Sequence, residues 1–276
     1  MNIQYGNKLI SSFMLAIDHE ILVNGDAYTN YSGLLFPSVS SIGGFNMYST
    51  PYRQLVNDTS ITGANIMSGV YVSGIYTTPG MSGLNSISIS EGQAFFINAP
   101  TSVSGIYAVK DYNLYLTTEP EERMLFETKM FLRPRMPQIL TGLPLNAQTI
   151  PAIFIKSMGG EDIPFCLGGG RNKSYEMRAL VFGDSEFSMN SACEILRTMA
   201  HKYYKIIDPL AFPFNAWGAY TGVNYNYSSL ITGHSVGQTY INKVSVSSLM
   251  SARQFSQMNP KIFPAFVDFE LWNFLA

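Results

Sequence analysis

The sequence predicts an α+β fold in which a mixed or antiparallel sheet carries two main helices and a β-rich insertion. Apolar residues recur at spacings of three and four, the period of one helical face, over residues 8–24 and 189–205. Elsewhere apolar and polar residues alternate over short stretches, as they do in half-buried strands. We expect residues 1–150 to supply the first helix and the β-rich region. Residues 151–276 are then a strand-loop-strand-helix core with an aromatic extension, and the two parts intertwine in one domain.

The first part of the chain reads as one helix followed by strands and turns. The helix ends at Asn24-Gly25, a pair that favours helix termination. We expect a small antiparallel sheet over residues 65–118, with a hairpin turn at Glu91-Gly92. Alternation over Met124–Leu132 predicts a further strand, and the prolines of residues 134–144 predict a bent connector after it.

The second part reads as two strands, a helix and an aromatic tail. Pro151–Ile155 and Tyr175–Phe182 are predicted strands, and a long glycine-rich loop separates them. The helix that follows is expected over Met189–Lys205 and ends before Pro209, with Asp184, Ser185 or Ser188 as its N-cap. Strand-like or aromatic stretches then follow at Ser229–Ile231, Tyr240–Val246 and Phe263–Leu275.

The composition indicates a protein whose surface is partly covered by partners. Charged residues make up 13% of the chain, about half of the share usual for soluble domains. The 18 Phe, 17 Tyr and 14 Met argue against disorder, which needs few aromatic residues and a high net charge. In a folded chain, low charge is typical of surfaces that a partner covers, so the composition favours an oligomer. A formal net charge of −2 provides no positive field that would hold nucleic acid through its phosphates.

Neither export nor membrane insertion is expected. An apolar-leaning run, Leu9–Ile17, is followed by Asp18-His19-Glu20, where a signal peptide would carry small cleavage-site residues. The sequence has no run of about 18 consecutive apolar residues, the length that a membrane helix needs. Cys166 and Cys193 lack the CxxC spacing of a metal or redox site, so we expect two reduced, packed thiols.

Residues 233–237, Gly-His-Ser-Val-Gly, match the nucleophile elbow of the α/β-hydrolases. That motif needs a strand before Ser235, a helix after it and a histidine further along the chain. No histidine follows Ser235, and the residues after it alternate like a strand. A turn between strands is therefore the preferred interpretation, and a serine hydrolase using Ser235 is kept as an alternative.

Two further motif matches fail on spacing. A zinc-protease helix beginning at His19-Glu20 would need histidine in place of Val23. The loop Gly168–Ser174 lacks the P-loop spacing, and a strand rather than a helix follows it. A metal site would require three distant histidines, His19, His201 and His234, to converge. We expect no catalytic residue, no cofactor and no metal.

The candidate functional residues are therefore interface residues. Arg133 and Arg135 can form a solvated or interfacial edge, and Gly169 and Arg171 lie in a loop that suits a surface contact. The C-terminal aromatics either dock on the chain's own core or anchor a neighbouring subunit. In the second case the anchoring residues are Phe269, Trp272 and Phe274.

The order of elements resembles that of tail terminator and tail-completion proteins of tailed bacteriophages. The resemblance rests on the expected helix at residues 8–24 and on residues 150–206, where Pro151–Ile155, a glycine loop, Arg178–Phe182 and the second helix follow one another. More broadly, the chain resembles phage virion proteins in three stretches, Asn24–Gly33, Ser60–Val70 and Phe126–Pro134.

The resemblance implies a structural protein that forms a ring, usually a hexamer, at the neck or proximal tail. Its partners would be copies of itself and neck or tail proteins such as the tube, the sheath or an adaptor. DNA would pass through the lumen without binding, the protein would be part of the virion after assembly in the host cytoplasm, and no membrane would be involved. A baseplate or tail-tip component has the same composition and also oligomerises, so it remains the second alternative.

Overall fold

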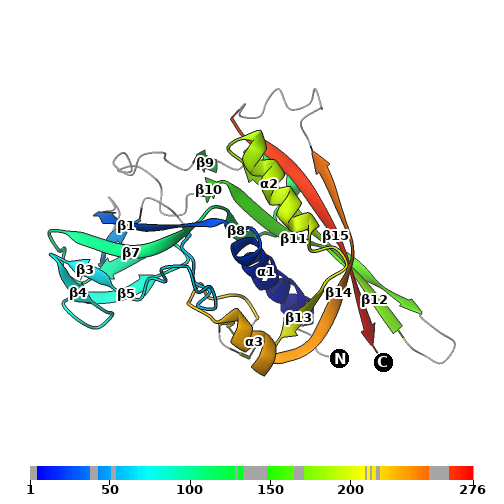
Figure 1. Cartoon of the computed structure of the whole chain (residues 1–276), viewed down its shortest axis with the longest axis horizontal. Helices are drawn as coiled ribbons and strands as arrows, with labels where there is room; N and C mark the ends of the chain where they lie inside the picture. The colour runs from blue at the N-terminus through cyan, green and yellow to red at the C-terminus, as the bar shows by residue number, and fades with distance from the viewer. Residues whose placement is uncertain are drawn as a thin grey trace.

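The computed structural model shows two large sheets, with the first helix near the middle of the molecule (Figure 1). In the residues that it describes, the regular structure consists of fifteen strands and four helices. Those residues are 5–37, 43–50, 54–127, 130–132, 148–164, 171–208, 210–211, 213–215, 218–248 and 261–275.

Six strands form one sheet in the order β13-β14-β15-β12-β11-β8. The C-terminal strand β15 lies inside this sheet, because Phe269 is paired with Met177 of β12 on one side and with Val244 of β14 on the other. The aromatic tail thus docks on its own core. The strands are β8 (Asn113–Leu116), β11 (Ala152–Pro164), β12 (Arg171–Gly183), β13 (Tyr203–Ile207), β14 (Ser235–Ser248) and β15 (Phe263–Leu275).

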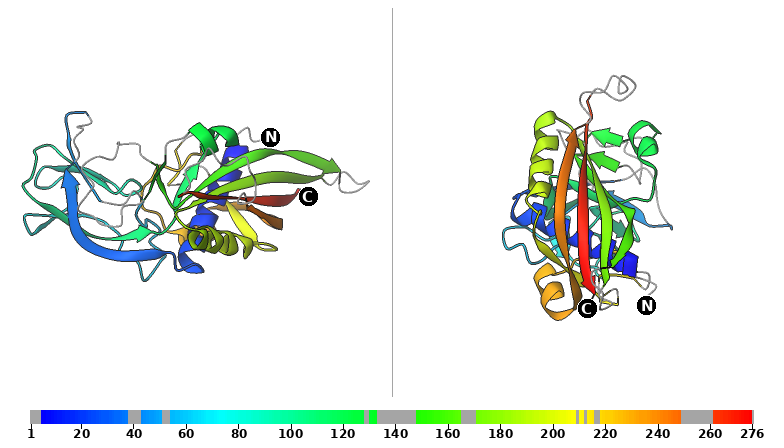
Figure 2. Two further views of the ribbon diagram at one scale, coloured as in Figure 1. Left: turned by 90° about the horizontal axis from the view of Figure 1, so that it is seen from above. Right: turned by 90° about the vertical axis from the view of Figure 1, so that its right-hand side faces the viewer.

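Helices α1 (Tyr5–Val23) and α2 (Glu186–Arg197) contribute to the core on one face of this sheet. Figure 2 shows α2 running along the long strands. Its N-cap is Ser185, whose side chain accepts a hydrogen bond from the backbone N–H of Ser188 in a capping box, which confirms one of the three predicted caps. Apolar residues from both helices pack with the inward-facing side chains of the sheet, including Leu9, Phe13, Ile17, Leu196, Val267 and Phe269.

The opposite face of the sheet has its own smaller core. Phe154, Leu180 and Phe182 point to this side and pack with Met124 and Ile150. Met124 belongs to the π-helix η1 (Arg123–Glu127), and Ile150 belongs to a parallel two-stranded sheet. That small sheet consists of β9 (Met130–Leu132) and β10 (Gln148–Ile150). The six-stranded sheet is therefore buried on both faces, which explains the apolar runs in its strands.

Seven strands form the second large sheet, in the order β4-β3-β7-β1-β2-β6-β5. Their inward-facing residues build a separate core around Leu35, Phe96, Val103 and Tyr107. All of its described pairings are antiparallel, and they include the predicted hairpin at Glu91-Gly92 between β5 and β6. The strands are β1 (Tyr28–Pro37), β2 (Asn46–Ser49), β3 (Val70–Val72), β4 (Ile75–Thr77), β5 (Leu84–Ser88), β6 (Gln93–Phe96) and β7 (Val103–Lys110).

The predicted α+β class with two main helices on one sheet is wrong, because the structure is mostly β. The predicted β-rich insertion is instead a second large sheet with its own core. This happens because one face of β1 and β7 is apolar enough to bury a core without any helix, as Leu35, Val103 and Tyr107 show. The region after residue 210 also adds two long strands, β14 and β15.

Three elements differ from their predicted type. The helix expected over Met189–Lys205 ends at Arg197, because Tyr204, Ile206 and Ile207 are buried as part of the strand β13. The strand expected at Ser229–Ile231 is the helix α3 (Tyr227–Gly233), which Asn226 caps through a hydrogen bond from the N–H of Ser229. The strand expected over Met124–Leu132 begins only at Met130, after the π-helix η1. No described helix combines the length and the hydropathy that a membrane crossing requires.

Candidate functional site

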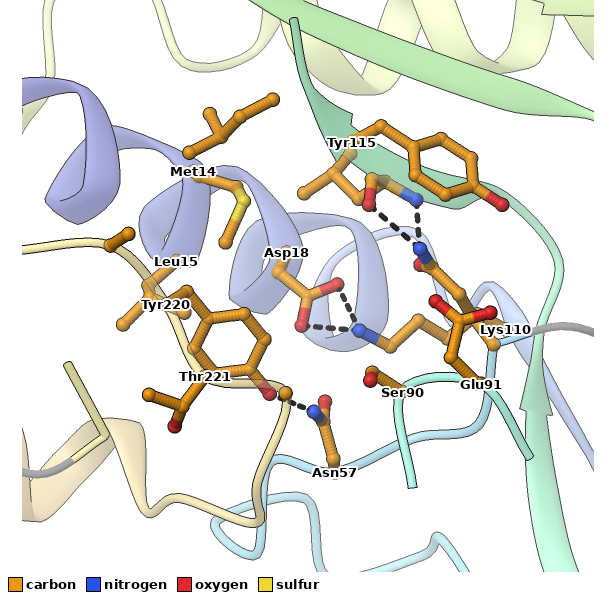
Figure 3. A pocket seen from close by; sticks show the side chains of 15 residues that line it. Met14, Leu15, Asp18, Asn57, Ser90, Glu91, Lys110, Tyr115, Tyr220 and Thr221 are labelled. Carbon is orange, nitrogen blue, oxygen red and sulfur yellow. Dashed lines mark hydrogen bonds and ion pairs between the residues drawn. The ribbon is translucent and has the colours of Figure 1, made fainter. Parts of the chain in front are cut away.

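A pocket of about 390 Å³ lies where the two large sheets meet (Figure 3). Helix α1 and strand β8 form one side of it, and the end of β7, the β5–β6 turn and the segments 54–57 and 219–222 form the rest. Its polar lining residues come from segments far apart in the sequence: Asp18, Gln54, Asn57, Ser90, Glu91, Lys110, Tyr115, Tyr220 and Thr221.

A buried ion pair joins α1 to β7 at this pocket. The Nζ atom of Lys110 lies 2.7 Å from both carboxylate oxygens of Asp18, and both side chains are buried. The hydroxyl of Tyr225 also donates to Oδ2 of Asp18, at 2.7 Å. Burial, followed by the nearby Asp18 carboxylate, raises the pKa of Tyr225 well above its ordinary value. Tyr225 therefore stays protonated and serves as a donor that stabilises the buried carboxylate.

A second buried carboxylate, Asp58, also lies in the joint, the region where the two large sheets meet. It accepts hydrogen bonds from the backbone and the hydroxyl of Ser60 and from the backbone of Tyr227, and Nδ1 of His19 lies 2.8 Å from its Oδ2. The ring of His19 stacks on that of Tyr227 at 4.4 Å between centroids. Burial alone would raise the pKa of Asp58, but the bonds from His19, Ser60 and Tyr227 outweigh burial and lower this pKa. Asp58 is therefore held as a carboxylate.

Because its pKa is lowered on folding, Asp58 contributes stability that is present above the ordinary aspartate pKa of 3.8 and is lost as the pH falls through the lower pKa of the folded state. We expect Asp58→Asn to have a smaller free energy of unfolding than the wild type at neutral pH. We also expect it to lose less further stability on acidification. Urea unfolding at a series of pH values measures both effects. The exposed Asp26→Asn variant is the control, and equal acid slopes for Asp58→Asn and wild type would contradict the prediction.

Backbone contacts lock the segments that carry these groups. The N–H of Tyr225 donates to the carbonyl of Asn57 at 2.9 Å, and the N–H of Thr59 donates to the carbonyl of Tyr225 at 2.7 Å. The Gln54 side chain pairs with the backbone of Leu114 in the edge strand β8, with bonds of 2.8 and 2.7 Å. The arrangement thus connects the seven-stranded sheet to the six-stranded sheet through buried polar contacts. These contacts stabilise the joint between the two sheets.

Sequence reasoning missed this joint. Asp18 sits among the apolar residues of α1, and a carboxylate on a buried helical face must find a buried partner. That signal was present in the sequence, but nothing local identifies Lys110 as the partner, because 92 positions separate the two residues. Asp58 and Tyr225 likewise meet only through the tertiary fold.

Ser235 does not occupy a nucleophile elbow. It follows the helix α3 and begins the strand β14, so the order of elements is the reverse of strand, nucleophile and helix. The interpretation as a turn between strands is also corrected, because the residues before Ser235 are helical. Ser235 itself is exposed, and His234 is the C-cap of α3.

The three histidines lie apart in the described structure. His19 contacts Asp58, and His201 contacts the hydroxyl of Tyr240 at 3.1 Å. Among the described residues, no three His, Cys, Asp or Glu side chains form a group that could hold a metal ion. Residues 171–174 of the glycine-rich segment belong to β12 rather than to a loop that opens a helix, so the P-loop comparison also fails on structure.

Cys193 lies buried and free in α2. Burial, together with the neighbouring Glu194, raises the pKa of its thiol to about 11. This matches the expected reduced and packed thiol, and a raised pKa disfavours the reactive thiolate form. Cys166 lies outside the described residues.

The structure places the predicted interface residues in different environments. Phe269 is buried in the core against Phe13, which favours docking of the aromatic tail on the chain's own core, the other role that the sequence allowed. Trp272 is half-buried, and its Nε1 donates to Glu270 at 2.7 Å. Arg171 and Phe274 are placed by their backbones at the ends of β12 and β15, where they pair with Leu275 and Asn172. Three of these predictions lie outside the described residues: Arg133, Arg135 and Gly169.

Large apolar side chains are exposed on both sheets. In the seven-stranded sheet and its turns they are Tyr31, Leu34, Ile75, Tyr76, Met81, Ile97 and Ile106. Around the six-stranded sheet they include Phe187, Tyr203, Leu210, Val236 and Val246. Exposed apolar side chains that gather into a patch mark surfaces that partners cover.

No known protein family, curated protein or solved structure matches this chain.

Proposed function

We propose that this chain is a structural subunit of a phage virion, which assembles in several copies as a ring at the neck or the proximal tail. The observation that carries the proposal is the combination of exposed large apolar side chains on both sheets with a charged share of only 13%. The order of sequence elements that resembles tail terminator proteins adds the location.

The physical reason lies in what a ring subunit must bury. Each copy in a ring contacts two neighbours, and a neck subunit also contacts the proteins above and below it. Much of its surface is then interface, where charged residues are depleted and aromatic residues and methionine are enriched. This composition supports the proposal, since apolar groups such as Leu34, Ile75 and Leu210 would be covered by neighbours.

The proposed partners are further copies of the chain, with a hexamer as the expected ring, and the tube, sheath or adaptor proteins next to it. The slightly acidic net charge of −2 suits a lumen through which DNA passes without binding. The proposed location is the assembled virion.

Native mass spectrometry of the purified chain, together with negative-stain images, tests the assembly. We expect closed rings of one defined mass. Gold-labelled antibody on phage particles tests the location, and we expect the label where the head meets the tail. Label at the distal tip would favour a baseplate component instead. A chain that is monomeric at every concentration and unlabelled in the particles would overturn the proposal.

A further inference from the structure

The charges of this chain are distributed very unevenly. Of its 17 basic and 19 acidic residues, the segment 27–110 contains only four, at positions 53, 58, 91 and 110. This segment supplies the whole seven-stranded sheet. Asp58 and Lys110 are buried in the contacts described above, and Arg53 lies outside the described residues. In the described part of the segment, Glu91 is then the one charged side chain that is not buried.

Among the described residues, one face of the seven-stranded sheet carries no charged side chain other than Lys110, whose charge is paired with that of Asp18, and its open part holds large apolar and tyrosine side chains. Leu34 pairs with Ser104, Ser104 pairs with Tyr71, and Tyr71 pairs with Tyr76, so these side chains share a face across β1, β7, β3 and β4. Ile106, two residues after Ser104, lies on that face as well. The opposite face carries the buried core residues Leu35, Val103 and Tyr107.

Part of this outer face is already covered within the chain. At the end nearest α1, Ala108 is buried against Leu22, Val56 and Ile61. At the other end the face stays open, since Leu34 is 55% exposed and Ile106 is 44% exposed. The open part therefore continues a face that is buried within the chain at its other end.

We propose that copies of this chain contact one another through the segment 27–110, with the open face around Leu34, Tyr76 and Ile106 at the centre of the contact. This inference rests on the proposed assembly into several copies. It assigns the copy-to-copy contact to the seven-stranded sheet, and it leaves the surface of the six-stranded sheet, with its charged side chains, to other partners.

The near absence of charge in this segment favours a second copy as the occupant. A charged partner would lose hydration against this face without gaining an opposite charge. The same segment of a second copy is itself almost free of charge, and its serine, asparagine and tyrosine side chains can pair across the contact. In a closed ring the two contacts of each copy use different surfaces, so the open face of one copy meets another part of the same segment in its neighbour.

Two matched double variants test this assignment by native mass spectrometry. Leu34→Lys/Ile106→Lys places two charges on the open face. Val236→Lys/Val246→Lys places two charges at positions of β14 with similar exposure, 55% and 41%. We expect the first variant to be monomeric at concentrations where the wild type and the second variant are multimers. Circular dichroism and thermal unfolding of both variants show whether each is folded.

A Leu34→Lys/Ile106→Lys variant that is folded and keeps the wild-type mass would overturn this inference alone. Loss of assembly in Val236→Lys/Val246→Lys with the first variant intact would also overturn it, and would place the contact on the six-stranded sheet. A wild type that is always monomeric would overturn the proposed assembly and this inference together.

Hydroxyl-radical footprinting of the unmodified protein provides a test that does not depend on the folding of a variant. We expect Leu34, Tyr76 and Ile106 to be less oxidised in the assembled protein than in the dilute, dissociated protein. We expect Val236 and Val246 to react equally in the two states. Equal oxidation of the first three residues in both states would overturn the inference.

Discussion

Lys110→Met is expected to reduce the free energy of unfolding by about 3–5 kcal/mol, because it leaves the buried carboxylate of Asp18 without its counter-charge. The two carboxylate oxygens lie at 2.7 Å from Nζ, and both side chains are buried, with the hydroxyl of Tyr225 as a further donor to Asp18. The hydroxyl of Tyr225 alone does not neutralise the charge. Equilibrium unfolding in urea, followed by circular dichroism, measures the loss.

Two controls separate the charge effect from other causes. Arg197→Met removes a cation from an exposed pair with Glu194 and is expected to change the stability by less than about 0.5 kcal/mol. The double variant Asp18→Leu/Lys110→Met removes both charges and is expected to recover most of the loss. A Lys110→Met variant that costs no more than Arg197→Met would show that the pair is not buried as described.

The same substitution is also expected to change the cooperativity of unfolding. Asp18 belongs to the helix that packs on the six-stranded sheet, and Lys110 ends a strand of the seven-stranded sheet. The ion pair therefore holds the two sheets together, along with the backbone contacts between Asn57, Thr59 and Tyr225. Weakening it is expected to broaden the unfolding transition, as the two cores of the protein begin to unfold separately.

Local sequence patterns predicted the elements whose buried residues form a clear apolar pattern in the sequence. The helix α1 has a clear apolar face and an Asn-Gly end, and the strands around Ile153 and Val181 contain short continuous apolar runs, so their types were predicted correctly. The segment Met199–Ile207 was not predicted correctly, because its apolar spacing fits a helix or a strand. Pairing with β14 decides in favour of the strand, and that pairing is a long-range contact.

The prediction of the fold class was wrong for a related reason. Short polar strands rich in Ser, Thr, Gly and Tyr give a weak local signal, so the region before residue 118 resembled an addition to a main domain. Its seven-stranded sheet forms because residues distant in sequence, such as Leu35 and Val103, pair and bury a common face. The buried polar joint between the sheets depends on the same kind of contact, and no local spacing specifies it.

Phe269→Ala is expected to reduce the free energy of unfolding by about 3–5 kcal/mol, the usual cost of removing a buried ring. Phe269 is only 1% exposed, lies in the central strand β15, and meets the ring of Phe13 edge to face at 4.9 Å between centroids. Removal of the ring leaves a cavity between α1 and the six-stranded sheet, where neither the helix nor the paired strands can collapse readily.

Phe187→Ala is the matched control, because Phe187 is 89% exposed and its truncation is expected to change stability by less than about 0.5 kcal/mol. The comparison also separates the two roles that the sequence allowed for the aromatic tail. Substitution of a core residue lowers the stability of the dissociated protein. Substitution of an anchor for a neighbouring subunit lowers only the mass of the assembly. Urea unfolding of the dilute protein and native mass spectrometry of the concentrated protein measure the two effects separately. A Phe269→Ala variant with wild-type stability and a reduced assembly would restore the anchor role.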